Sequence, residues 1–199
     1  MTTEQDYGPG LDRRVVVPRL LADHENMLFV TGLAGTARDV SALCQENGNY
    51  YTMAGAMGGA TAMGLGLALA QPDRRVVVVT GDGELLMNLG SLSVVSVMAP
   101  SNMSIVCVDN GHYQETGNQA SHTSLGVDLE QIARGSGFKA TRRVDAEDQI
   151  DDARQLVAGS NTPSFVLVRV NQAPPPTYRR SLDASYWKTR FRTSLLGTA

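Results

Sequence analysis

Short apolar runs, each followed by a polar and glycine-bearing turn, recur along this chain of 199 residues. Periodicity alone does not separate such runs from helix, but their length and their β-branched residues favour strands that are buried on both faces. A more polar segment, Lys139–Val144, is predicted to be an edge strand. The four apolar runs predicted as strands are Met27–Thr31, Arg75–Thr80, Ile105–Asp109 and Ser164–Val170.

Helical patterns occupy the segments between these runs. Gly48 and Pro100 follow two of the predicted helices, and both residue types commonly end helices. Asp145 is predicted to be the N-cap of a later helix, because aspartate accepts hydrogen bonds from the first free amides. The predicted helices cover residues 11–24, 36–47, 59–70, 84–98, 128–137, 145–158 and 183–196.

Alternation of buried strands and helices predicts an α/β fold with three layers, in which helices cover both faces of a mostly parallel sheet. We expect one domain over residues 1–199, with a flexible lead-in at 1–10 and a basic tail at 172–199. Ligands of such sheets bind at the carboxyl ends of the strands. The most polar turns follow the runs VVVVT and IVCVD, so we expect the site there.

Composition narrows the function classes. The chain is 42% hydrophobic and 19% charged with a net charge of −3, which gives no indication of a nucleic-acid or membrane surface. Its two cysteines form no CxxC pair, which argues against a disulfide framework, a zinc site or an iron–sulfur cluster. The polar N-terminus carries no apolar signal region. We therefore expect a cytoplasmic protein.

The motif with the clearest chemistry is Gly81-Asp82-Gly83, which ends one buried strand and is followed after 26 residues by Asn110 at the end of the next. Glycines allow close backbone approach, and the free amides near Glu84 and Leu85 suit a phosphate. The Asp82 carboxylate, the Asn110 amide oxygen and the main-chain carbonyl of His112 are hard oxygen ligands of the kind Mg²⁺ prefers. The GDG triplet alone is equally compatible with a plain strand–turn–helix.

The spacing of this pair resembles the thiamine diphosphate motif. The resemblance extends over residues 12–172 and includes GDGELLMNLGSLSVV, IVCVDNGHYQETGNQASHT and DLEQIARGSGF. The chain is similar to the pyrophosphate-binding domain of thiamine diphosphate-dependent decarboxylases. Within this family it looks like sulfopyruvate decarboxylase β subunits and the C-terminal part of phosphonopyruvate decarboxylases. The resemblance implies thiamine diphosphate and Mg²⁺ as cofactors.

The resemblance also implies roles for residues outside the pair. Met57, 25 residues before Asp82, corresponds to the apolar side chain under the cofactor's rings, and the carbonyl of Gly55 to the acceptor for the cofactor's amino group. The turn around Thr36 corresponds to the segment that contacts the far end of the diphosphate. Alanines replace the family's serines at positions 56 and 37, which puts one local contact in doubt at each place.

Two histidines, His112 and His122, bracket a long polar loop at residues 110–127. Imidazole titrates near neutrality, so either ring is a candidate for proton transfer or substrate contact. An ordinary loop histidine is an equally good interpretation of each.

In the resembled family, a glutamate from a separate pyrimidine-binding domain activates the cofactor. Glu46 and Glu84 are the carboxylates nearest to the motifs, but both lie on the diphosphate domain. The resemblance therefore implies a partner α subunit, with self-association as a possibility for the isolated chain. The predicted function is the β subunit of a decarboxylase for a three-carbon acidic 2-oxo acid, such as sulfopyruvate or phosphonopyruvate. Alternatives are an acetolactate synthase-type carboligase subunit and a non-catalytic thiamine diphosphate-binding module.

Overall fold

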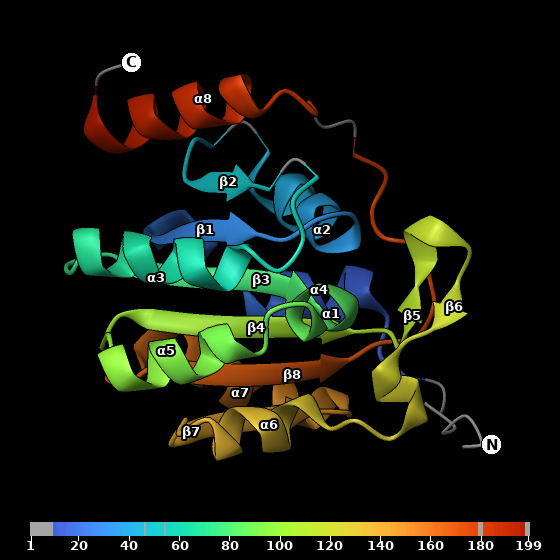
Figure 1. Ribbon diagram of the computed structural model, residues 1–199. Helices are drawn as coiled ribbons and strands as arrows, with labels where there is room; N and C mark the ends of the chain where they lie inside the picture. Colours follow the sequence, from blue (N-terminus) through green and yellow to red (C-terminus); the bar gives the residue numbers. More distant parts are fainter. Residues whose placement is uncertain (1–9, 46, 54, 179–180, 198–199) are drawn as a thin grey trace.

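The computed structural model describes residues 10–45, 47–53, 55–178 and 181–197. Residues 1–9 of the expected lead-in and Glu46 therefore lie outside the described residues. A parallel sheet of six strands in the order β2-β1-β3-β4-β8-β7 forms the centre of the molecule (Figure 1). Its strands are β1 (Met27–Thr31), β2 (Tyr50–Thr52), β3 (Arg75–Gly81), β4 (Met103–Asp109), β7 (Ala140–Val144) and β8 (Ser164–Arg169).

Helices cover both faces of this sheet. One apolar core holds side chains from α1 (Arg13–Leu20), α2 (Gly35–Cys44) and α7 (Ile150–Gly159). The core on the other face holds side chains from α3 (Ala60–Ala70), α5 (Gly90–Met98) and α6 (Leu129–Gly135). The remaining helices are α4 (Asp82–Leu86), α8 (Ala184–Leu196) and the 3₁₀ turns η1 (His24–Asn26), η2 (Gln114–Thr116), η3 (His122–Leu125) and η4 (Glu147–Gln149).

Burial explains why the strands have continuous apolar sequences rather than alternating ones. Every residue of β1 and of β4 is buried, as expected for parallel strands between two helical layers. The predicted three-layer α/β fold is confirmed. Within the described residues, none of the helices combines the length and the apolar character needed to cross a membrane.

The helix predicted over residues 84–98 is wrong as one element, because the chain breaks between α4 and α5. The break has a tertiary cause at Asn88. Its side-chain amide donates a 2.9 Å hydrogen bond to the carbonyl of Gly58, and its main-chain carbonyl accepts from Ser91 Oγ at 2.7 Å. The interruption thus ties the glycine-rich turn before α3 to the segment after the GDG motif.

The predicted N-cap at Asp145 is also wrong. A 3₁₀ turn, η4, precedes α7, and the side-chain oxygen of Gln149 accepts hydrogen bonds from the amides of Asp145 at 2.7 Å and Ala146 at 3.2 Å.

Two further features were not predicted. They are the edge strand β2 and the hairpin of β5 (His112–Tyr113) and β6 (Gln119–Ala120) inside the expected loop.

The predicted C-terminal helix is confirmed as α8, capped by Asp183, whose carboxylate accepts from the amide of Ser185 at 2.8 Å. Trp187 is buried and packs against Tyr50 with ring centroids 5.1 Å apart. Arg190 lies over the Tyr50 ring at 4.7 Å. This part of the basic tail is therefore a structural contact that covers the edge strand β2.

The packing of α3 on β3 predicts opposite effects for two glycines of one helix. A Cβ on Gly64 would lie 2.1 Å from Cγ2 of Val78, whereas a Cβ on Gly66 would meet no atom within 4 Å. Gly64→Ala should lower the free energy of unfolding by about 1–3 kcal/mol through overpacking. Gly66→Ala should raise it by about 0.5–1 kcal/mol through helix propensity. Urea denaturation of both variants measures this, and equal effects would contradict the packing.

Candidate functional site

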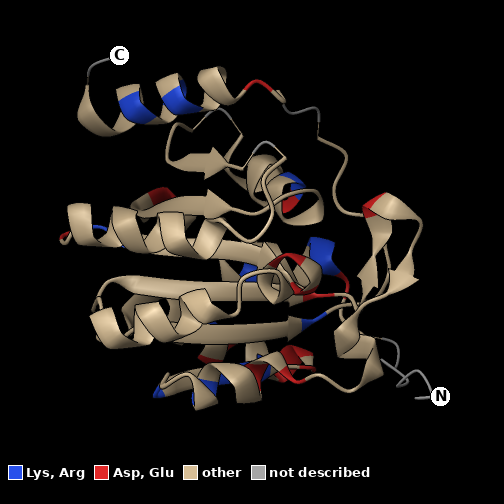
Figure 2. Ribbon diagram, in the orientation of Figure 1, with Lys and Arg blue, Asp and Glu red and all other residues tan. Residues whose placement is uncertain are grey.

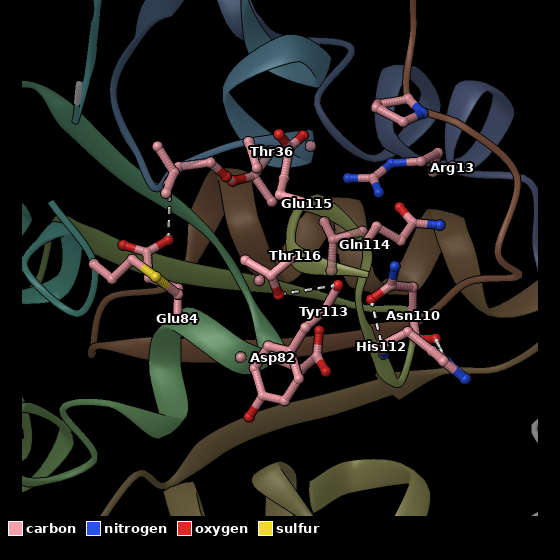
Figure 3. Close-up of a pocket in the computed structure, with 18 residues that line it drawn as sticks. Arg13, Thr36, Asp82, Glu84, Asn110, His112, Tyr113, Gln114, Glu115 and Thr116 are labelled. Atoms are coloured by element: carbon pink, nitrogen blue, oxygen red, sulfur yellow. Dashed lines mark hydrogen bonds between the residues drawn. The ribbon is translucent and has the colours of Figure 1, made fainter. Parts of the chain in front are cut away.

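A solvent-open pocket lies at the carboxyl ends of β1, β3 and β4 (Figure 3). It occupies the edge of the sheet where the sequence placed the site. The residues that line it are Arg13, Leu33–Thr36, Met57, Gly81–Glu84, Val108, Asn110, His112–Thr116 and Pro175.

Asp82 is held by a cluster of polar side chains behind the pocket wall. Ser121 donates a hydrogen bond from its hydroxyl to Asp82 Oδ2. Thr123 Oγ1 lies 2.8 Å from Asp109 Oδ1 and 3.3 Å from Asp82 Oδ2, so it stands between the two carboxylates. Burial, together with the neighbouring charge of Asp109, raises the pKa of Asp82 above its usual range. A cation at this carboxylate would offset both unfavourable effects.

Asn110 lies at the end of β4, which pairs with the end of β3 through Gly81 and Val108. The structure thus brings Asn110 to the same pocket as Asp82. Its side-chain oxygen accepts a 3.2 Å hydrogen bond from the amide of His112, which closes the turn. The second lone pair of an amide oxygen remains for another partner.

The His112 ring is fixed by two neighbours. Its Nδ1 lies 3.1 Å from the carbonyl oxygen of Asn110, and its Nε2 lies 3.2 Å from the side-chain nitrogen of Gln172. With a proton on Nδ1, the ring donates to the Asn110 carbonyl and accepts from Gln172 at Nε2. His122 does not line the pocket, and its Nδ1 lies 3.2 Å from the hydroxyl of Tyr113. Of the two histidine candidates, only His112 faces the pocket.

Glu84 contributes more than the backbone amide that the sequence suggested. Its buried carboxylate accepts hydrogen bonds from the amide of Leu33 at 3.3 Å and the hydroxyl of Thr80 at 3.1 Å. A Cβ on Gly32 would lie 1.4 Å from the same oxygen, so a larger residue here would displace the Glu84 carboxylate. Burial raises the pKa of Glu84 to about 6. The side chain links the turn after β1 to the end of β3.

Tyr113 also escaped the sequence analysis. Its ring packs directly on the GDG turn, because a Cβ on Gly83 would lie 2.4 Å from Tyr113 Cε1. The sequence analysis did not identify Ser121 or Thr123 either. All three lie in the polar loop, and no spacing rule connects them to the GDG motif; Ser121 and Thr123 lie 39 and 41 residues after Asp82.

The other predicted residues divide into two groups. Met57 and Thr36 line the pocket, and the Met57 side chain remains 41% exposed. Gly55 and Leu85 do not line it; Gly55 adopts a positive φ of 100°, and the Leu85 side chain belongs to the apolar core. Their proposed backbone contacts stay predictions. Arg38 forms a 3.2 Å surface ion pair with Glu115.

The oxygen atoms of Asp82 and Asn110 at the pocket are of the kind that suits a magnesium ion. Among the described residues, no group of three or more His, Cys, Asp or Glu side chains is placed to hold a metal. Mg²⁺ commonly binds through one or two carboxylates and completes its shell with phosphate oxygens and water. The Asp82 carboxylate and the Asn110 amide, which both line the pocket, are compatible with this pattern, and the main-chain carbonyl of His112 stays a predicted ligand.

Comparison with known proteins agrees with this architecture. Residues 34–170 match the family described as thiamine pyrophosphate enzyme, C-terminal TPP binding domain. The chain is 37% identical over 187 residues to the sulfopyruvate decarboxylase subunit beta of Methanothermobacter thermautotrophicus, covering 94% of this chain and 97% of that protein. Benzoylformate decarboxylase from Polynucleobacter necessarius shares the fold, with a TM-score of 0.67 and 18% identity over 88% of this chain and 36% of that one.

Other relatives are matched over less of their length. The sulfopyruvate decarboxylase subunit beta of Methanocaldococcus jannaschii is 42% identical over 57% of this chain and 60% of its own length. The phosphonopyruvate decarboxylase of Streptomyces viridochromogenes is 37% identical over 79% of this chain, which spans only 39% of that protein.

Fold and pocket define an α/β ligand-binding domain whose site lies at the carboxyl ends of parallel strands. The chain belongs to the thiamine pyrophosphate enzyme family, through its C-terminal TPP binding domain. The family predicted from the sequence is confirmed, and thiamine diphosphate is the cofactor for which this domain is named.

The raised pKa of Glu84 predicts a pH dependence of stability in the metal-free chain. Its ordinary pKa is 4.5 and its folded value is about 6, so between these values the folded chain binds more protons than the unfolded chain. Its contribution to stability is therefore greatest at low pH and falls, by about 2 kcal/mol in all, as the pH rises through this window.

Glu84→Gln should remove this part of the pH dependence. The measurement is urea denaturation of the apo chain from pH 4.5 to 8, with Glu25→Gln, a change at an exposed position, as control. Parallel pH profiles for the wild type and Glu84→Gln would contradict the assignment.

Proposed function

We propose that the chain is the diphosphate-binding β subunit of a thiamine diphosphate-dependent decarboxylase that acts on a small 2-oxo acid carrying a second acidic group, such as sulfopyruvate or phosphonopyruvate. The observation that carries the proposal is the meeting of Asp82 and Asn110 at the ends of adjacent strands, in the pocket of a domain belonging to this family. The names of its relatives supply the substrate class.

In this proposal, Asp82, Asn110 and the carbonyl of His112 hold Mg²⁺, and the amides at the start of α4 receive a phosphate. Tyr113 keeps the GDG turn covered, and Met57 supports the cofactor's rings from the exposed side of the pocket. The bound cofactor supplies the electron sink for decarboxylation, while the protein supplies binding, orientation and electrostatics. His112 remains a candidate for substrate contact.

We also propose that a partner α subunit completes the active site. The chain spans 97% of a relative named subunit beta but 41% of a Methanosarcina acetivorans relative named simply sulfopyruvate decarboxylase. The names of the relatives called subunit beta support a separate partner subunit, and in this proposal the partner supplies the activating glutamate. A cytoplasmic location is part of the same proposal.

The surface of α3 and α5 supports a protein partner. Neither helix contains a charged residue, and Figure 2 shows both without colour for Lys, Arg, Asp or Glu. Large apolar side chains are exposed there, among them Met63 at 40%, Val94 at 54% and Val97 at 82%. Contiguous exposed apolar surface of this kind marks interaction sites.

The metal assignment predicts a selective loss of cofactor binding. Asp82→Asn should weaken binding of thiamine diphosphate with Mg²⁺ by at least about 100-fold, because it removes the charged ligand of the cation. Isothermal titration calorimetry measures the affinity, with Asp73→Asn in an exposed turn as control. Unchanged affinity in Asp82→Asn would refute the site.

The partner assignment predicts that the isolated chain folds but has no turnover. Adding the α-type chain should give decarboxylation of sulfopyruvate or phosphonopyruvate at ordinary enzyme rates, about 1 per second or more. Val94→Lys should weaken assembly, whereas Val15→Lys on α1, the same change at a similar exposure of 48% against 54%, should not. Analytical ultracentrifugation and an aldehyde assay test this, and full turnover by the isolated chain would overturn it.

A further inference from the structure

Arg13 is a buried cation at the edge of the pocket. It begins α1, and the preceding segment is held beside β8 by a bridge between Leu11 and Val170. The residue is only 3% exposed. Figure 3 shows its guanidinium extending from α1 into the pocket, on the side of Thr36 and Gln114.

One half of this guanidinium is paired and the other half is not. Nε lies 3.1 Å from Asp39 Oδ1, and Nη2 lies 2.6 Å from Asp39 Oδ2. Within the part of the chain that the structure describes, Nη1 makes no hydrogen bond. Arg13 is also the one Lys or Arg side chain among the described residues that line the pocket. The free edge of the fork is therefore available to a ligand.

The guanidinium lies against the N-terminus of α2. A Cβ on Gly35, the first residue of that helix, would lie 2.8 Å from Nη1 and 2.7 Å from Nη2. This ten-residue helix has no side-chain cap and no acidic residue in its first turn. A cation at a helix N-terminus opposes the helix dipole. An anion bound between Nη1 and the free amides of α2 would remove the conflict.

Stability alone gives a weak reason for this arrangement. Burial raises the pKa of Asp39 despite its contact with Arg13, so removal from water outweighs the attraction of the pair. Buried ion pairs can often be replaced by apolar residues without loss of stability. Ala34, the cap position of α2, adopts φ 62° and ψ −117°, and strained backbone of this kind clusters at ligand sites.

We propose that Arg13, through Nη1, binds the terminal phosphate of the cofactor's diphosphate together with the amides at the start of α2. This inference rests on the proposed function. It assigns a binding role to a residue that lies outside every motif identified in the sequence. A guanidinium gives strong charge-assisted hydrogen bonds to phosphate oxygens. Thiamine monophosphate lacks the terminal phosphate of thiamine diphosphate. It is therefore the comparison ligand that should not depend on Arg13.

The test measures how far the full-length chain distinguishes thiamine diphosphate from thiamine monophosphate. The double variant Arg13→Gln/Asp39→Asn removes both charges and leaves net charge unchanged. Its dissociation constant for thiamine diphosphate with Mg²⁺, measured by calorimetry, should rise about 10- to 100-fold, as expected for a charged hydrogen bond. The constant for thiamine monophosphate should change by less than about threefold. Arg14→Gln, an exposed neighbour paired with Asp12, is the matched control and should change neither.

Equal losses for the two ligands, or no loss for either, would overturn the inference. A changed KM for the 2-oxo acid with unchanged cofactor affinity would also overturn it, because Arg13 would then serve the substrate. Thermal unfolding checks that the double variant folds. If it does not, Arg13→Lys keeps the ion pair but removes the fork and should show the same selective loss. Wild-type binding that depends on Asp82 but not on Arg13 would leave the proposed function standing, whereas absence of wild-type binding would remove both.

Discussion

The burial of carboxylates at the carboxyl ends of β3 and β4 is the constraint on which the site depends. Asp82 and Asp109 are each buried, at 3% and 1% exposure, and share the hydroxyl of Thr123. Two carboxylates so placed are unfavourable when both are ionised. The segment from Gly111 to η3 exists in its folded form because Ser121 and Thr123 satisfy these groups. The same hydrogen bonds bring the β5–β6 hairpin over the pocket and place Tyr113 on Gly83.

Sequence patterns sufficed where local chemistry determines the outcome. The buried strands were found because all-apolar runs have few alternatives between two layers of helices. The placement of Asp82 and Asn110 at one pocket could be predicted because adjacent parallel strands end at the same edge of the sheet. Residues that act across long sequence distances gave no signal. Arg13 forms an ion pair with Asp39, and the Glu84 carboxylate accepts a hydrogen bond from the amide of Leu33. No periodicity in the sequence predicts either contact.

The errors in the secondary structure have the same origin. Residues 84–98 have helical character throughout, but the bond from Asn88 to the carbonyl of Gly58 interrupts the helix. Strand β2 is only three residues long, and it is stabilised by Trp187 and Arg190 of α8. Asp145 does not cap a helix, because its amide donates a hydrogen bond to the side-chain oxygen of Gln149. In each case a distant or competing side chain outweighs a local propensity.

The pocket combines three arrangements that each lower stability in the empty protein. Asp82 and Glu84 have raised pKa values, Ala34 has a strained backbone, and Arg13 faces the positive end of α2. A divalent cation at Asp82 would relieve the first, and an anion beside Arg13 would relieve the last. Arg13, Gly35 and Asp82 line the same pocket, and a diphosphate carrying Mg²⁺ would bring both charges to it. Binding of a metal-bound diphosphate would therefore offset free energy that folding leaves unsatisfied, which supports the proposed function over a site for either ion alone.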